Sequence, residues 1–292
     1  MSEIEDLNCG IIIKVIAAGK TFANVSTSLN EPATFILNRP PDRIPPLEIL
    51  DVTDKVSRAE ILKFISNADW LFVITDVESS LAEKVAECIE EFRSLPTTPS
   101  FSIPYFSMPW EVKESGEMVN RGELLQRESK CPLVTSIILC PSADDERLKD
   151  INFGTQIILP EDKIAEIGLT NDEAIYQVID KITCILSLRC LIGLDFVDVV
   201  STLGNAGRAY VGLGKSLGTL QAAKKALESP LLIEEISKAK NILFVFVGNS
   251  ESLNMLEANE ASFYPEGSEA ILQVAVDDTA DGVTAFILAT NF

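Results

Sequence analysis

The 292-residue chain contains no histidine. This absence excludes histidine bases, triads built on histidine, and most catalytic zinc sites, which recruit imidazole ligands. The six cysteines are scattered, mostly within apolar segments, and no two of them form a CxxC pair. We therefore expect buried free thiols in a cytoplasmic protein, and no metal site.

Long apolar runs and positive charge are also scarce. The longest apolar runs, such as 70–75 and 137–140, have the length of strands and fall far short of the roughly 20 residues that span a bilayer. The acidic start, MSEIEDLNCG, lacks the basic and apolar regions of a signal peptide. The net charge of −20 repels phosphate backbones and anionic lipids. We expect a protein that binds neither nucleic acid nor membrane directly.

The rest of the composition, 47% hydrophobic and 23% charged, is typical of globular proteins. Short apolar runs indicate strands, and apolar residues at helical spacing indicate helices. Strands are predicted at 11–16, 47–52, 67–76, 101–106, 133–140, 241–248, 270–276 and 283–290. Helices are predicted at 57–66, from Ser79 or Ser80 to Arg93, and at 111–129, 172–190, 194–210 and 217–228. Ser57 and Glu60 have the spacing of a capping box.

Strands and helices alternate up to about residue 190, which favours a parallel sheet in the first half. The strand-rich end favours a second subdomain with a mixed sheet. We divide the chain into an N-terminal domain at 1–171, a central connecting helix at 172–193 and a C-terminal domain at 194–292.

Four segments, in order along the chain, carry a resemblance to a known family. They are IKVIAAGKTFAN at 13–24, NADWLFVITD at 67–76, LIGLDFVDVVSTLGNAGRAYVGLGKSLG at 191–218, and the group of AAKKALESPLL at 222–232, KNILFVFVGNSESL at 240–253 and FILATNF at 286–292. In this order and spacing they resemble the FtsZ cell-division family of the FtsZ/tubulin superfamily. The resemblance implies a tubulin/FtsZ-like α/β fold, with a Rossmann-like parallel-sheet N-terminal half, a central helix and a mixed-sheet α+β C-terminal half. It also implies subunits that stack head to tail.

The glycine loop that holds GTP phosphates in that family is missing. The family's phosphate loop falls on residues 76–84, where no glycine stands and where Asp76, Glu78 and Glu83 are acidic. Glycine lets backbone N–H groups approach phosphates closely, whereas one like charge at about 4 Å opposes binding by about 4 kcal/mol at an effective dielectric of 20. We expect no GTP binding, no cofactor and no GTPase activity.

The polar and acidic residues at 76–80 have two explanations. Glu78, Ser79 and Ser80 directly precede a predicted helix, where side-chain caps and the helix dipole favour them. On this interpretation they replace the phosphate with built-in negative charge. Alternatively, Asp76 and Glu78 bind a divalent cation. We expect that no metal is bound.

The family's other nucleotide contacts are only partly present. In the first loop Gly19 and Asn24 match, but Ala17 and residues 20–23 replace the family's glycines. Lys20-Thr21 after Gly19 matches a GK[ST] string, but the upstream glycine of GxxxxGK is missing because Lys14 stands there. The family's P-N-D motif falls on 141–143 or on 160–162, and neither has the asparagine, while Trp110-Glu111 matches its Phe-Glu pair. The predicted degenerate nucleotide site consists of Gly19, Asn24, Asp76, Glu78, Ser79 and Ser80.

The family's subunit-contact loop is better preserved. Residues 194–199 keep both of its acids, Asp195 and Asp198, although its asparagine is replaced by Gly193. In the family these carboxylates polarise the water that attacks the neighbour's nucleotide. In this chain there are two interpretations. Asp195 and Asp198 only cap a helix, or in addition they dock on an FtsZ-like protein or on another copy of this chain. No catalytic residue is expected.

The resemblance therefore implies an FtsZ-like pseudo-GTPase that interacts with other cytoskeletal or cell-division proteins and caps or modulates FtsZ-type filaments. One alternative is a protein that self-assembles without nucleotide. Another is an FtsZ homologue that retains GTP binding and weak activity.

Overall fold

The computed structural model describes residues 12–19, 47–66, 68–94, 110–112, 118–120, 132–149, 151, 154–188, 190–263 and 267–292. Within these ranges one sheet has ten strands in the order β2-β1-β3-β6-β7-β9-β12-β10-β11-β8. Its strands are β1 (Ile13–Ala18), β2 (Glu48–Val52), β3 (Trp70–Asp76), β6 (Leu133–Cys140), β7 (Thr155–Pro160), β8 (Cys190–Ile192), β9 (Arg208–Ser216), β10 (Asn241–Gly248), β11 (Glu269–Val276) and β12 (Val283–Thr290). The helices are α2 (Arg58–Ile65), α3 (Ser80–Ser94), α4 (Glu161–Glu166), α5 (Asn171–Ser187), α6 (Phe196–Leu203), α7 (Thr219–Leu227) and α8 (Met255–Ser262), with 3₁₀ turns η3 (Glu146–Lys149) and η4 (Ile236–Lys238).

The first half of the sheet is parallel throughout. β2, β1, β3, β6 and β7 run in one direction, so their carboxyl ends meet at one edge. All six residues of β1 are buried, as are the first six of β3. Continuous apolar runs are typical of parallel strands covered on both faces. The predicted parallel sheet is confirmed.

The second half of the sheet is mixed. β12 pairs antiparallel with both β9 and β10, β10 pairs parallel with β11, and β8 closes the edge antiparallel to β11. β9 joins this half to the first through two parallel pairs with β7, Gln156↔Arg208 and Ile157↔Ala209. The predicted mixed sheet is therefore confirmed, and one continuous sheet runs through both halves. The division at 171 and 193 stays a prediction.

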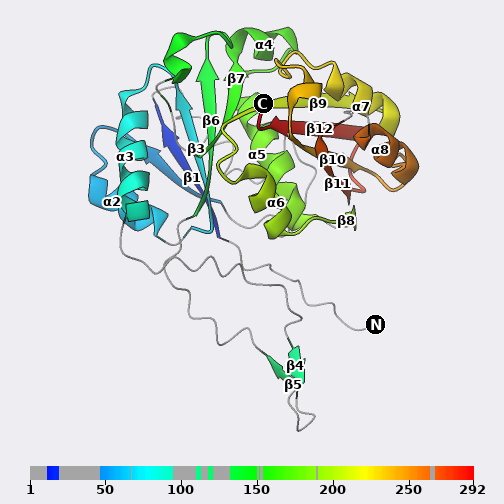
Figure 1. Cartoon of the computed structure of the whole chain (residues 1–292), viewed down its shortest axis with the longest axis horizontal. Helices are drawn as coiled ribbons and strands as arrows, with labels where there is room; N and C mark the ends of the chain where they lie inside the picture. The colour runs from blue at the N-terminus through cyan, green and yellow to red at the C-terminus, as the bar shows by residue number, and fades with distance from the viewer. Residues whose placement is uncertain are drawn as a thin grey trace.

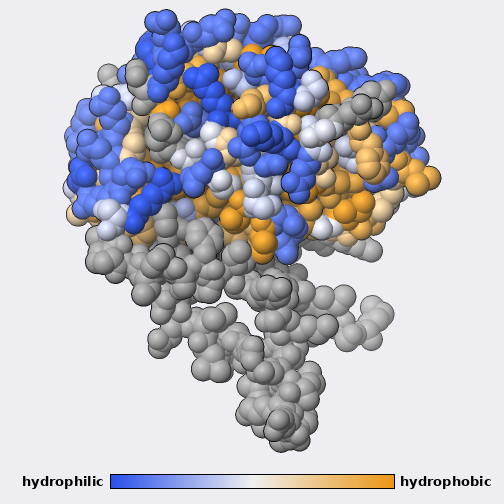
Figure 2. All heavy atoms as spheres, in the orientation of Figure 1, coloured by the Kyte–Doolittle hydropathy of each residue, from blue (hydrophilic) through white to orange (hydrophobic). Residues whose placement is uncertain are grey.

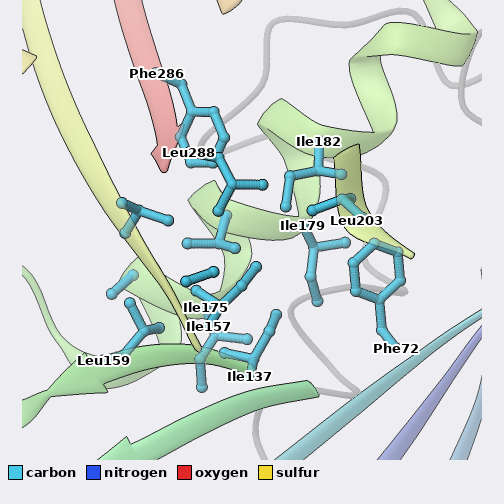
Figure 3. Packing of buried hydrophobic residues seen from close by; sticks show 14 of the residues in the cluster. Phe72, Ile137, Ile157, Leu159, Ile175, Ile179, Ile182, Leu203, Phe286 and Leu288 are labelled. Atoms are coloured by element: carbon cyan, nitrogen blue, oxygen red, sulfur yellow. The ribbon is translucent and has the colours of Figure 1, made fainter. Parts of the chain in front are cut away.

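Helices cover the sheet on both faces. The largest hydrophobic cluster lies on one face, where α5 and α6 pack against strands of both halves. Figure 3 shows Ile175, Ile179 and Ile182 of α5 pointing toward Ile137 and Ile157 on one side and toward Phe286 and Leu288 on the other. On the opposite face, α2 and α3 cover the first half and α7 and α8 the second, as their places in Figure 1 indicate. The core under α5 is thus shared by both halves.

Local signals set the helix boundaries. The predicted capping box is present: the Ser57 N–H donates to Glu60 Oε2 at 2.7 Å, and the Glu60 N–H donates to Ser57 Oγ at 3.3 Å. α5 begins with a second capping box, formed by Thr170 and Glu173. Within the described ranges, no helix is both long and apolar enough to cross a membrane.

Three helix predictions need correction. The helix predicted at 111–129 is wrong where the chain is described, because β4 (Trp110–Val112) and β5 (Met118–Asn120) pair as antiparallel strands. The helical stretch predicted at 194–210 ends at Leu203, and 208–210 begin β9. The connecting helix ends at Ser187, before β8. β7 was not predicted, and the strand predicted at 101–106 lies outside the described residues.

Candidate functional site

A cavity of about 670 Å³ lies at the carboxyl ends of the parallel strands. Ligands of open α/β sheets bind at this edge, because loops and helix N-termini converge there. Five residues of the predicted degenerate nucleotide site line this cavity: Gly19, Asp76, Glu78, Ser79 and Ser80. Asn24, the sixth, lies outside the described residues. The structure thus brings together residues from loops more than 50 positions apart.

The turn from β3 into α3 uses the acidic and hydroxyl side chains for its own backbone. The Glu78 N–H donates to Asp76 Oδ1 at 2.9 Å, and the Leu81 N–H donates to Ser79 Oγ at 3.3 Å. The Val77 N–H donates to the Leu139 carbonyl oxygen at 3.1 Å, which ties the turn to β6. These bonds support the capping interpretation for Ser79, and Asp76, for which it was not made, also accepts a backbone bond of the turn.

Glu78 forms an ion pair across the rim of the cavity. Arg147 Nη1 donates to Glu78 Oε1 at 3.1 Å, while Nε and Nη2 of the same guanidinium hold the two oxygens of Asp145 at 2.9 and 2.7 Å. The bidentate bond from Arg147 lowers the pKa of Asp145 below its ordinary value. Sequence reasoning missed Arg147, which is 69 positions from Glu78 and belongs to no motif.

The cavity is acidic overall. Asp54 and Glu161 line it together with Asp76 and Glu78, and no lysine or arginine is among the described residues of its lining. Gly19 is the one glycine among those lining residues. In the described part of the chain no group of three or more Cys, Asp or Glu side chains is arranged to hold a metal ion. Sequence reasoning missed Asp54 and Glu161. Asp54 follows the predicted strand at 47–52 closely, whereas Glu161 follows β7, which was not predicted.

The floor of the cavity contains a thiol that is not a nucleophile. Cys140, the last residue of β6, is buried. Burial raises the pKa of Cys140 to about 12, and the carboxylates of Asp145, Asp162 and Glu161 add to this. Since only the thiolate attacks electrophiles, Cys140 is inert near neutral pH. This fits the predicted buried free thiols.

Both candidates for the family's P-N-D motif reach the cavity. β6 and β7 end side by side, with Cys140 opposite Pro160, and Pro141 and Glu161 follow directly and line the cavity. The alignment therefore stays open between 141–143 and 160–162, and neither offers an asparagine.

The contact loop lies at the opposite edge of the sheet. Phe196 packs its ring 5.8 Å from that of Trp70, the first residue of β3, whereas Asp76 at the other end of β3 lines the cavity. A seven-residue strand separates the two by about 20 Å. The loop and the cavity of one molecule therefore cannot meet, and only a second molecule can bring a loop to this cavity.

The two loop acids form a complete capping box. The Asp198 N–H donates to Asp195 Oδ1 at 2.9 Å, and the Asp195 N–H donates to Asp198 Oδ2 at 3.0 Å. Asp195 is exposed, and so is Val197 between them. The capping interpretation is borne out in this geometry; at the start of α6 Asp195 is exposed to solvent and Asp198 is half-buried.

No protein-family model matches the chain. Cell division protein FtsZ 1 of Thermococcus kodakarensis is 32% identical over 162 residues, which cover 50% of this chain and 43% of that protein. The match thus spans less than half of the relative's length.

Solved structures match more of the chain at lower identity. An empty FtsZ dimer of M. jannaschii has a TM-score of 0.67 at 16% identity, and the match covers 96% of this chain and 88% of that one. GDP-bound CetZ1 of Haloferax volcanii has a TM-score of 0.55 at 12% identity, covering 97% and 94%. A GTPγS-form protofilament of TubZ from Bacillus thuringiensis serovar israelensis has a TM-score of 0.58 at 10% identity, covering 96% and 87%.

The architecture is therefore the FtsZ/tubulin-like α/β fold, as predicted. Together with the sequence match, it makes the chain similar to proteins of the FtsZ/tubulin superfamily.

Proposed function

We propose that this chain is an FtsZ-like pseudo-GTPase that docks on FtsZ-type filaments and caps or modulates them. Similarity to FtsZ, CetZ and TubZ proteins supports a role in cell division or the cytoskeleton. One observation carries the finer proposal: the cavity at the nucleotide edge is lined by four carboxylates and, among its described residues, by no cation. The contact loop at the other edge keeps both of its acids, Asp195 exposed and Asp198 half-buried, within reach of a partner.

Electrostatics argue against a triphosphate in this cavity. A carboxylate about 4 Å from a phosphate opposes binding by about 1 kcal/mol in water and about 4 kcal/mol at an effective dielectric of 20. Arg147 offsets the charge of Glu78, so the repulsion of a triphosphate comes from the carboxylates of Asp54, Asp76 and Glu161. Even one of these charges in a partly dry site lowers affinity by up to about a thousandfold.

The two edges of the molecule are therefore unequal. The edge that carries the Asp195–Asp198 loop can meet the nucleotide-bearing pocket of a family member. The chain's own cavity, in contrast, presents no nucleotide to the next subunit. Addition of this chain to a filament end would stop further growth there. The expected activity is capping, and GTPase activity is not expected.

A nucleotide-independent homopolymer is the second candidate, and the same charges disfavour it. Head-to-tail stacking of identical chains would bring Asp195 and Asp198 toward the acids of the next cavity. Such stacking should need high salt or a divalent cation. Light scattering with and without GTP, at low and high salt, separates this candidate from capping.

The capping proposal is tested by co-sedimentation with GTP-assembled polymers of Thermococcus kodakarensis FtsZ 1. We expect this chain to pellet with the polymers and to lower their GTPase rate at substoichiometric ratios. Val197→Lys should abolish both effects, because it changes the exposed loop surface and leaves the capping box intact. Arg93→Gln on α3 is the matched control and should behave as the original chain. The proposal fails if the chain neither pellets with the polymers nor changes their GTPase rate.

Isothermal titration with GTP and GDP tests the cavity separately. We expect no sub-millimolar binding of either nucleotide. A sub-millimolar dissociation constant would refute the electrostatic argument and favour the third candidate, an FtsZ homologue with residual GTP binding.

A further inference from the structure

A second cavity, of about 410 Å³, lies where β9 begins and β12 ends. None of the described residues that line it also lines the acidic cavity at the carboxyl ends of the parallel strands. Its volume is in the range of small-molecule sites, roughly 300–1,000 Å³. The capping proposal makes no use of this second cavity, which we call the β9–β12 cavity.

Arg208 and Tyr210 reach the β9–β12 cavity because side chains alternate along β9. Ala209 and Val211 are buried in the hydrophobic cluster under α5. Successive side chains of a strand point to opposite faces of the sheet, so Arg208 and Tyr210 point away from α5. On that face Tyr210 is buried in a cluster with residues of β6 and β7, while Arg208 at the start of the strand is exposed. The cavity therefore combines a charged side chain with an aromatic one.

Two cations line the cavity, Arg208 and Lys240. Within the part of the chain that the structure describes, neither forms an ion pair with a carboxylate. Arg208 is held by a side-chain hydrogen bond with Tyr210. The Lys240 N–H donates to the carbonyl oxygens of Thr290 and Asn291 at 3.1 and 3.2 Å, which fixes the backbone at this point. Both cations therefore start from anchored positions.

The rest of the chain is strongly acidic. Asp and Glu outnumber Lys and Arg by 44 to 24, and residues 241–292 contain no Lys or Arg. Hydrophilic side chains cover much of the face that Figure 2 shows, in keeping with this charge. In such a chain a base has many acids with which to pair. Two bases that share a cavity and have no carboxylate partner among the described residues therefore indicate an anionic ligand.

The lining favours an anion with a single charge. Among the described lining residues Glu234 is the one acid, and its carboxylate lies 3.5 Å from Lys238 Nζ. Two cations and one carboxylate are balanced by one further negative charge. A ligand with two charges would bring the second one toward Glu234, which would repel it.

Neutral groups add a donor and an aromatic wall. Burial raises the pKa of Tyr210, and Arg208 acts in the opposite direction, so the hydroxyl stays protonated at neutral pH and can donate. The Phe292 ring lies 5.2 Å from that of Tyr210, edge to face. Asn291 has a φ of 58°, which is uncommon for a non-glycine residue and marks a constrained backbone. The wall beside the cations is therefore aromatic and held in place.

We propose that the β9–β12 cavity binds a small aromatic monocarboxylate. The carboxylate accepts hydrogen bonds from the Arg208 guanidinium and the Lys240 ammonium, and the ring lies against Phe292 and Tyr210. A planar guanidinium matches both oxygens of a carboxylate, which sets the orientation of the ligand. This site does not depend on the capping proposal, since it uses neither the acidic cavity nor the Asp195–Asp198 loop.

The test uses 2-naphthoate as the probe and follows its NMR relaxation with the full chain at about 0.15 M salt, where long-range attraction is screened. We expect a dissociation constant on the order of 1 mM, as is usual for so small a ligand. Arg208→Gln and Lys240→Gln should each weaken binding by roughly tenfold, the loss expected for one charge-assisted hydrogen bond.

Two further variants separate recognition from general charge. Lys224→Gln is the matched control, because Lys224 is an exposed cation of α7 outside the cavity lining, and it should leave binding unchanged. Glu234→Gln removes the one acid of the described lining and should strengthen binding by about threefold, the effect of one exposed charge. Thermal melts followed by circular dichroism verify that each variant is folded.

Three results would overturn the proposal. The first is no binding at millimolar 2-naphthoate. The second is an equal loss in Arg208→Gln, Lys240→Gln and Lys224→Gln, which would mean that the probe responds only to the total charge. The third is equal binding of the neutral amide 2-naphthamide, which would show that the ring alone is recognised and the cations are not used.

Discussion

Replacing Ile179 with alanine should destabilise both halves of the molecule together. Ile179 is 1% exposed and belongs to a hydrophobic cluster that includes Phe72 of β3 and Leu288 of β12 (Figure 3). Its side chain therefore contacts a core that the N-terminal and C-terminal halves share. If that core couples them, a cavity made here weakens the whole sheet and not one half alone.

The size of the effect follows from the atoms removed. Ile179→Ala deletes about three buried carbons, which contribute about 0.8 kcal/mol each by transfer from water. The cavity left behind adds to this, so the free energy of unfolding should fall by about 2–5 kcal/mol. Leu191→Ala is the matched control, because Leu191 is 48% exposed on β8. The control should change the stability by no more than about 0.5 kcal/mol.

Urea unfolding provides the assay. Trp70 is buried in β3 and is the sole tryptophan once Trp110 is replaced by Phe, so its fluorescence reports on the first half. Far-UV circular dichroism reports on the whole chain. The two transitions should coincide in the original chain and shift together in Ile179→Ala. A loss below about 1 kcal/mol, or a variant in which the two signals separate, would refute the shared core.

Two further predictions concern close packing and the buried thiol. Gly214→Ala would place a methyl group 2.2 Å from the Ala222 carbonyl oxygen and 2.4 Å from the Ala226 nitrogen, so it should destabilise by about 2 kcal/mol or more in urea melts. Gly218→Ala, with nothing within 4 Å, should be tolerated, and equal losses in both would contradict this reasoning. Because burial raises the pKa of Cys140 from 9.0 to about 12, the neutral thiol is favoured on folding. Its contribution to stability is complete below pH 9 and is lost as the pH rises toward 12. Iodoacetamide at pH 8 should label Cys140 far more slowly in the folded chain than in urea, as peptide mass spectrometry would measure, and equal rates would contradict its burial.

Much of the fold could be predicted from the sequence, because its signals are local. The apolar run of Leu133–Cys140 predicted β6 with the bounds that the structure gives, and so did the run at 241–248 for β10. The Ser57 and Glu60 spacing predicted a capping box that needs only one turn of helix. The secondary-structure predictions were wrong where pairing with a neighbouring strand determines whether a segment is helix or strand. The helical stretch predicted at 194–210 overlaps the start of Arg208–Ser216, yet this segment is a strand because β12 pairs with it along its length and α7 approaches Gly214 closely.

The sequence by itself determined that residues 76–84 contain no glycine and include Asp76 and Glu78, because residue identity is independent of folding. That this segment replaces a phosphate loop stays a prediction. The sequence also placed Asp195 and Asp198 at the spacing of a cap. The tertiary structure alone decided that Asp54 and Glu161 complete an acidic cavity, that Arg147 reaches Glu78, and that the contact loop lies at the opposite edge of the sheet. These relations join residues tens of positions apart. They depend on strand order and register, which no local pattern encodes.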